Sequence, residues 1–139
     1  MGGVLVDSCV VIDISDPLSP WYEGSVSALE SVDDGVPLLV SPVIYAECAV
    51  GFGRTETLER LLDTLDLGFR ELPREALFLA GEAFLRYRRR RGTKTGVLPD
   101  FFIGAHAAVE GLRLVTRDTT RVGGYFPGVE LIVPEGASA

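Results

Sequence analysis

Four acidic residues occupy positions where a carboxylate could take part in chemistry. Two follow shortly after runs that are typical of buried β-strands, and two lie in mostly apolar segments that are predicted to be helical. The four are Asp7, Glu47, Asp100 and Asp118. Burying an ionised carboxylate is costly unless another group compensates its charge. No basic residue lies within one helical turn of Glu47, so its partner must come from elsewhere in the chain.

Each acid also has a purely structural interpretation. Asp7 and Asp100 could cap the helices that follow them, and Asp118 could form a turn. Taken together, four acids without fixed basic partners would repel one another. One or two divalent cations would relieve that repulsion, and a site of carboxylate oxygens suits Mg²⁺ or Mn²⁺. Beside a phosphodiester, such a site could activate a water nucleophile and stabilise the leaving oxygen.

The predicted elements would bring these acids to one edge of a β-sheet. Short apolar runs alternate with helical patterns, which is typical of an α/β domain with a parallel sheet. We predict a three-layer α/β/α fold with a central parallel sheet of four to five short strands, at residues 4–6, 38–40, 69–72, 113–115 and 129–133. Residues 116–121 are predicted as a turn region. Because ligands bind at the carboxyl ends of such strands, the strands would deliver Asp7 and Asp118 to one site.

The composition limits the class of protein. Its 139 residues predict a single domain over residues 1–134 and a flexible tail at 135–139. The net charge of −7 argues against a non-specific nucleic-acid coat but is compatible with a nuclease that has an acidic site. No apolar run is long enough for a membrane helix, and the first residues lack the basic region of a signal peptide. We therefore expect a cytoplasmic protein without membrane contact, in which Cys9 and Cys48 are free thiols.

Positive charge is concentrated in one stretch. Six of the 13 Lys and Arg residues fall between Arg86 and Lys94. They could form the solvated end of a helix, where basic residues interact favourably with the helix dipole. They could also bind RNA phosphates on the way to Asp100. The candidate RNA contacts are Arg86, Arg89, Arg90, Lys94 and, beside Asp118, Arg117. The single histidine, His106, is predicted to be a packed helix residue rather than a general base.

Four segments, in this order, resemble the acidic motifs of the PIN-domain ribonucleases, and the size and order resemble the VapC toxins of bacterial toxin–antitoxin pairs. The segments are Val4–Asp7, Ser41–Glu47, Pro99–Ala107 and Leu114–Asp118. The resemblance implies an Mg²⁺- or Mn²⁺-dependent endoribonuclease that acts as the toxin of a VapBC-type pair. In that case Asp7, Glu47, Asp100 and Asp118 would be the catalytic and metal-binding acids. Ser8 and Thr116 would be the hydroxyl residues beside the metal.

The resemblance also implies partners. The first is an RNA substrate, single-stranded or structured, with tRNA as one candidate. The second is a VapB-like antitoxin that blocks the groove, often with an arginine. The third is a second copy of the chain, which would form a homodimer. The chain departs from the family pattern at Ser8, where Thr is commoner, and at Cys9, where a polar residue such as Asn is frequent. Asp13 could add negative charge to the site or cap the first short helix, and the cap is the favoured prediction.

Two other functions fit parts of the pattern. A non-catalytic PIN-like module would bind RNA or protein without cutting, and the absence of one acid would favour it. All four acids are present. A phosphoacceptor receiver domain would need an acidic pair early in the chain and a lysine at a late strand end, whereas the only lysine, Lys94, falls in a predicted loop.

Overall fold

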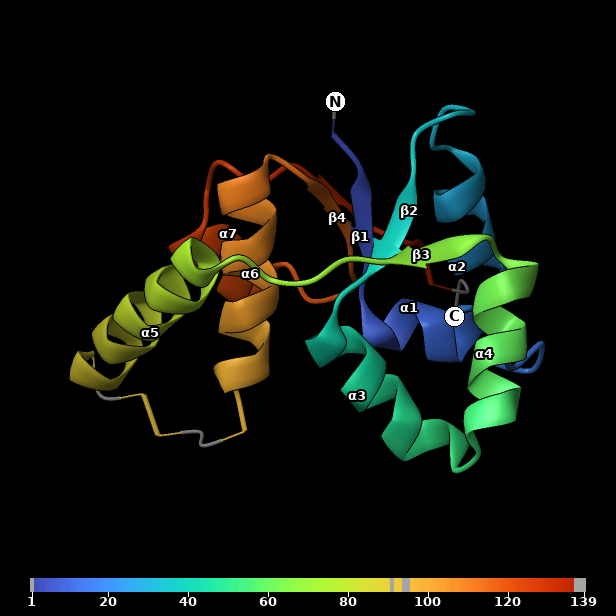
Figure 1. The fold of residues 1–139 in the computed structure, drawn as a ribbon, viewed down its shortest axis with the longest axis horizontal. Helices are drawn as coiled ribbons and strands as arrows, with labels where there is room; N and C mark the ends of the chain where they lie inside the picture. Colours follow the sequence, from blue (N-terminus) through green and yellow to red (C-terminus); the bar gives the residue numbers. More distant parts are fainter. Residues whose placement is uncertain (1, 91, 94–95, 137–139) are drawn as a thin grey trace.

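The computed structural model describes residues 2–90, 92–93 and 96–136 (Figure 1). Within these residues, five strands form one sheet in which every neighbouring pair is parallel. The strands lie in the order β3, β2, β1, β4, β5. Their bounds are β1 Val4–Val6, β2 Leu38–Val40, β3 Leu67–Phe69, β4 Arg113–Val115 and β5 Leu131–Ile132. The predicted parallel α/β architecture is confirmed.

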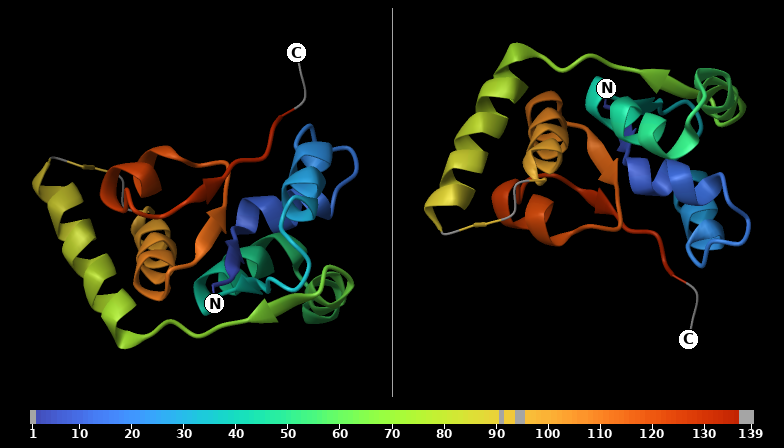
Figure 2. Two further views of the ribbon diagram at one scale, coloured as in Figure 1. Left: turned by 90° about the horizontal axis from the view of Figure 1, so that it is seen from above. Right: turned by 90° about the horizontal axis from the view of Figure 1, so that it is seen from below.

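Helices cover both faces of this sheet. Figures 1 and 2 show α5, α6 and α7 on one side of the strands and α1 to α4 on the other. This cover explains why the central strand β1 is a continuous apolar run, since parallel strands are buried on both faces. The helices are α1 Ser8–Ile14, α2 Tyr22–Glu30, α3 Pro42–Phe52, α4 Thr55–Thr64, α5 Arg74–Arg89, α6 Leu98–Glu110 and α7 Thr120–Tyr125.

The strand order reverses between β1 and β4. From β1 the chain moves outward to β2 and β3, and it then returns to place β4 on the other side of β1. Leu5 is in register with Leu39 on one side and with Leu114 on the other. In open parallel sheets, such a reversal leaves a crevice beyond the carboxyl ends of the two strands, and ligands bind there. The residues that follow β1 and β4 therefore border the expected ligand site.

Two elements differ in position or kind from the sequence prediction, and β5 is shorter than predicted, at Leu131–Ile132 rather than 129–133. The third strand lies at Leu67–Phe69 rather than at 69–72, because Gly68 pairs with Leu39 inside the sheet although glycine is depleted in strands. The helix α7 occupies part of the predicted turn region. Its two adjacent glycines, Gly123 and Gly124, lower its helix propensity. Burial of Val122 against the core overrides that preference.

An aromatic cluster holds α5, α6 and α7 together. At its centre is Phe101, which is fully buried. Its ring lies edge-on to those of Phe84 and Tyr125, with centroids 5.8 and 5.1 Å apart, and the ring of Tyr87 lies 5.6 Å away. Edge-to-face contacts of this kind add to the burial of apolar area. The cluster fixes the beginning of α6, which carries Asp100.

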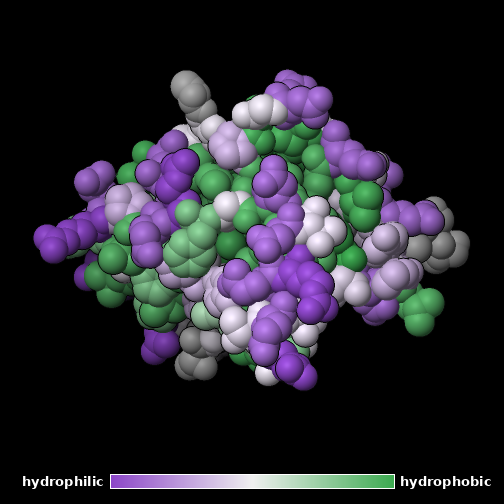
Figure 3. Space-filling model, turned by 45° about the vertical axis from the view of Figure 1, so that its right-hand side comes forward, coloured by the Kyte–Doolittle hydropathy of each residue, from purple (hydrophilic) through white to green (hydrophobic). Residues whose placement is uncertain are grey.

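Among the described residues, no helix combines the length and the apolarity needed to cross a membrane. Figure 3 shows hydrophilic and apolar side chains interspersed over one face. Both cysteines are free thiols, as predicted. Of the predicted tail, Glu135 and Gly136 lie against α2, close to Gly24 and Trp21, and residues 137–139 fall outside the described part of the chain.

Candidate active site

Asp7 joins the end of β1 to the start of α1. It caps α1, as its structural interpretation predicted, because its Oδ1 accepts a hydrogen bond from the backbone N–H of Ser8 at 2.8 Å. Its Oδ2 accepts a second hydrogen bond, from the hydroxyl of Thr116 at 2.6 Å. The side chain is only half-buried, so the capping role does not hide the carboxylate from the crevice.

Thr116 connects the two strands that border the crevice. Its side chain is almost fully buried, and its hydroxyl donates to Asp7 from the residue directly after β4. The same oxygen accepts a hydrogen bond from the backbone N–H of Asp118 at 3.1 Å. The threonine therefore fixes the positions of Asp7 and of the backbone at Asp118 relative to each other.

Glu47 reaches the site from α3, which the sequence starts sharply. Ser41 caps this helix by accepting from the N–H of Ile44, and Pro42 occupies the first helical position. Ser8 donates its hydroxyl to Glu47 Oε1 at 3.1 Å and so links Glu47 to the residue beside Asp7. Burial raises the pKa of Glu47, and the charges of Asp7 and Asp100 raise it further, whereas the Ser8 hydrogen bond lowers it.

Asp100 lies in the first turn of α6 and is not its cap, since the helix begins at Leu98. Its Oδ2 accepts a hydrogen bond from Arg121 at 2.5 Å. Burial raises the pKa of Asp100, the Arg121 guanidinium lowers it, and the charges of Asp118 and Asp7 raise it. The same guanidinium nitrogen lies 3.5 Å from Asp118 Oδ2. Asp100 and Asp118 thus share one basic partner.

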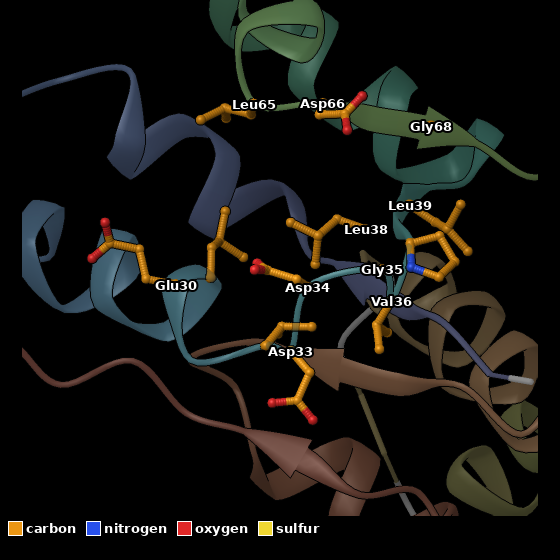
Figure 4. A pocket seen from close by; sticks show the side chains of 13 residues that line it. Glu30, Asp33, Asp34, Gly35, Val36, Leu38, Leu39, Leu65, Asp66 and Gly68 are labelled. Carbon is orange, nitrogen blue, oxygen red and sulfur yellow. The ribbon is translucent and has the colours of Figure 1, made fainter.

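These contacts bring all four predicted acids together. A small hollow is lined by three of them and by Thr116, with apolar side chains beneath; the lining residues are Asp7, Asp100, Ile103, Leu114, Thr116, Asp118 and Val122. Glu47 joins this group through Ser8. A larger hollow, shown in Figure 4, lies at the other end of β2 and β3. Its acidic side chains do not converge on one point, so it is a weaker candidate for a metal site.

Those predicted basic residues that the structure describes fall into two separate groups. Arg86, Arg89 and Arg90 are exposed at the end of α5. The guanidinium groups of Arg86 and Arg90 lie 5.9 and 5.6 Å from the ring centre of Tyr125 in α7, so this group extends towards the helix that carries Arg121. Lys94 lies outside the described residues. Whether any of these residues contacts RNA stays a prediction.

Arg117 points to a different cluster. Its Nε lies 3.0 Å from Asp13 Oδ2, and its guanidinium lies over the ring of Trp21, 4.7 Å from the centre. Asp13 is buried and also accepts a hydrogen bond from Ser19 at 3.2 Å. The prediction that Asp13 caps the first helix was therefore wrong, because its carboxylate pairs with Arg117. This ion pair holds the loop after β4 against α1.

Arg121 is the site residue that the sequence interpretation missed. It was assigned to the end of a turn region, where an arginine is usually solvated. Local spacing gave no signal, because Asp118 lies in the loop before α7 and only the position of this helix, which was not predicted, brings Arg121 within 3.5 Å of Asp118 Oδ2. His106 is fully buried with its Nε2 2.6 Å from Glu110 Oε1, and it is a packed helix residue as predicted.

The donor set fits a hard divalent cation. It consists of four carboxylates and two hydroxyls, and oxygen ligands of this kind suit Mg²⁺ and Mn²⁺. As the side chains stand, however, no three acidic, histidine or cysteine residues in the described chain form a ready metal site. Thr116 and Arg121 already engage carboxylate oxygens of Asp7 and Asp100. Binding a cation would require some of these contacts to be exchanged.

Several solved structures share this fold. A chain of VapBC2 from Rickettsia felis, bound to a DNA fragment from the promoter, is 17% identical with a TM-score of 0.70, covering 95% of this chain and 98% of that one. A chain of a toxin–antitoxin complex from Klebsiella pneumoniae is 25% identical with a TM-score of 0.62, and the match covers 91% of this chain and 95% of that one. A chain of FitAcB from Neisseria gonorrhoeae is 20% identical with a TM-score of 0.63, and the match covers 93% of this chain and 96% of that one.

The comparison by sequence identifies the family. No curated protein matches the chain. The family model of the PIN domain matches residues 4–121, a span that begins at β1 and ends at Arg121 in α7. It contains all four acids of the crevice and both hydroxyl residues that link them. The chain therefore belongs to the PIN domain family.

Proposed function

We propose that this protein is an Mg²⁺- or Mn²⁺-dependent endoribonuclease that hydrolyses RNA phosphodiester bonds. The observation that carries the proposal is the convergence of Asp7, Glu47, Asp100 and Asp118 at the crevice between β1 and β4. Like charges placed this close favour a bound cation. PIN domains are generally nucleases, which supports the same reaction.

The residues of the crevice have separate roles in this proposal. The four acids would hold the cation, and Ser8 and Thr116 would orient Glu47 and Asp7 through the hydrogen bonds described above. When bound, a divalent cation would help to generate the water nucleophile and would stabilise charge on the leaving oxygen. The exposed arginines at the end of α5 would bind the RNA backbone electrostatically.

We further propose that the enzyme acts in the cytoplasm as a VapC-type toxin with a VapB-like antitoxin. The structurally similar chains come from complexes of this kind, which supports a protein partner of the same class. A homodimer and a tRNA substrate belong to the same proposal. The alternative, a non-catalytic PIN-like module, is favoured by one observation, namely that Arg121 already neutralises part of the acidic cluster.

The direct test is cleavage of RNA by the purified protein with and without metal. We expect a single-stranded RNA to be cut only when Mg²⁺ or Mn²⁺ is added and to remain intact in EDTA. Because burial raises the pKa of both Glu47 and Asp100, these acids take up protons at a higher pH than ordinary carboxylates. Cleavage should therefore decline, as pH falls, before the range near pH 4 where unperturbed acids titrate. Cleavage that continues in EDTA would contradict the proposal.

Charge reversal at the end of α5 should weaken RNA binding. In the double variant Arg89→Glu/Arg90→Glu, loss of two phosphate contacts should reduce the slope of log affinity against log salt by about 1.4, since each contact on a single strand contributes about 0.7. The measurement is fluorescence anisotropy with a labelled RNA at several salt concentrations. The matched control is Arg54→Glu/Arg60→Glu, which makes the same charge change at the cap and on the body of the distant helix α4 (Figure 1). Equal effects of both pairs would show a net-charge effect only.

A further inference from the structure

Arg121 lies between two of the four acids. Its NH1 donates to Asp100 Oδ2 at 2.5 Å and lies 3.5 Å from Asp118 Oδ2, and only 18% of its side chain is exposed. The guanidinium also lies 5.9 Å from the ring centre of Tyr87 in α5. Among the ion pairs of the described residues, only those of Arg121 involve the acids of the crevice. The arginine is therefore part of the site.

The guanidinium and a divalent cation would need the same oxygens. Asp100 and Asp118 line the hollow together with Asp7, and both direct an Oδ2 atom to Arg121. A cation bound by these oxygens would lie within a few ångströms of a permanently charged group, where like charges repel strongly in a partly buried site. The two positive charges therefore exclude each other at Asp100 and Asp118.

We propose that Arg121 is a built-in counter-ion that competes with the divalent cation and sets the affinity of the site for metal. In the metal-free protein it neutralises Asp100 and Asp118, and it must leave at least one of them before a cation can load. This inference rests on the proposed metal-dependent function and adds a residue that regulates it. Buried Val122 anchors α7, so the exchange in this proposal is a rotamer change of the long arginine side chain and not an unfolding of the helix.

Binding of Mn²⁺ to the RNA-free protein, measured by calorimetry and by electron paramagnetic resonance, tests the proposal. Removing a hydrogen-bonded charged competitor should tighten Mn²⁺ binding roughly 10- to 100-fold in Arg121→Gln. Arg121→Lys keeps the charge but loses the rigid, planar guanidinium whose NH1 lies beside both acids, so its affinity should fall between those of the wild type and Arg121→Gln. The metal-free Arg121→Gln protein should melt at a lower temperature, and Mn²⁺ should raise that temperature more than in the wild type.

The control is Arg88→Gln, which removes one positive charge from α5, where Arg88 lies over the ring of Phe84. Its Mn²⁺ affinity should stay within about twofold of the wild type, because Arg88 is exposed and dissolved salt screens exposed charges. An unchanged or weaker affinity in Arg121→Gln, or an equal gain in Arg88→Gln, would overturn the role of Arg121. A wild-type protein and an Arg121→Gln variant that both bind no Mn²⁺ would instead overturn the metal-dependent function itself.

Discussion

Asp7→Asn is expected to lower Mg²⁺-dependent RNA cleavage by at least about 100-fold, the scale found when one charge-stabilising group is removed from an active site. The substitution keeps the shape of the side chain. Its amide oxygen can still accept from the N–H of Ser8, so the cap of α1 survives. What disappears is the negative charge between β1 and β4. Circular dichroism should therefore be unchanged while cleavage and Mn²⁺ binding are lost together.

The control for this variant is Asp63→Asn, the same change at an exposed position on α4. We expect its cleavage rate to match that of the wild type, because surface substitutions away from the site have small effects. Full activity in Asp7→Asn would refute the assignment of the crevice as the active site. Loss of cleavage with full Mn²⁺ binding would show that Asp7 positions other groups and does not hold the metal.

The sequence predicted the parts of the fold that depend on local patterns. The strands at 4–6, 38–40 and 113–115 were placed correctly, because each is a short run of β-forming residues bounded by polar or turn-forming ones. The expectation that Asp7 and Asp118 lie at one edge of the sheet followed from the rule that the carboxyl ends of parallel strands meet at the same edge. The convergence of the four acids in the structure agrees with that expectation, and their catalytic role stays a proposal.

The sequence did not reveal features that depend on contacts between distant segments. The Asp13–Arg117 ion pair joins α1 to the loop after β4, and nothing near either residue in the chain points to the other. The helix α7 has two glycines, so its existence depends on tertiary burial and not on propensity. Because α7 was missed, Arg121 was not recognised as a partner of Asp100, although the chain around Asp100 was identified as part of the site.

Phe101→Ala is expected to have the largest effect on stability. The ring is fully buried, and removing such a phenylalanine typically lowers the free energy of unfolding by about 3–5 kcal/mol. For a domain of this size, that loss corresponds to a fall of roughly 10–20 °C in Tm. The measurement is urea denaturation followed by circular dichroism. Since such domains are stable by only about 5–15 kcal/mol, this loss removes a large part of the free energy that keeps the variant folded.

The control is Phe78→Ala, the same substitution on α5 at a side chain that is 72% exposed. Its free energy of unfolding should change by about 0.5 kcal/mol or less.

A third variant, Phe101→Leu, separates burial from ring geometry, because leucine fills most of the space but makes no edge-to-face contact with Tyr125 or Phe84. If Phe101→Ala and Phe78→Ala lose equal stability, the aromatic cluster does not hold α5, α6 and α7 together. If Phe101→Leu recovers most of the loss, burial contributes more than ring geometry, and the position of Asp100 depends on filling this part of the core.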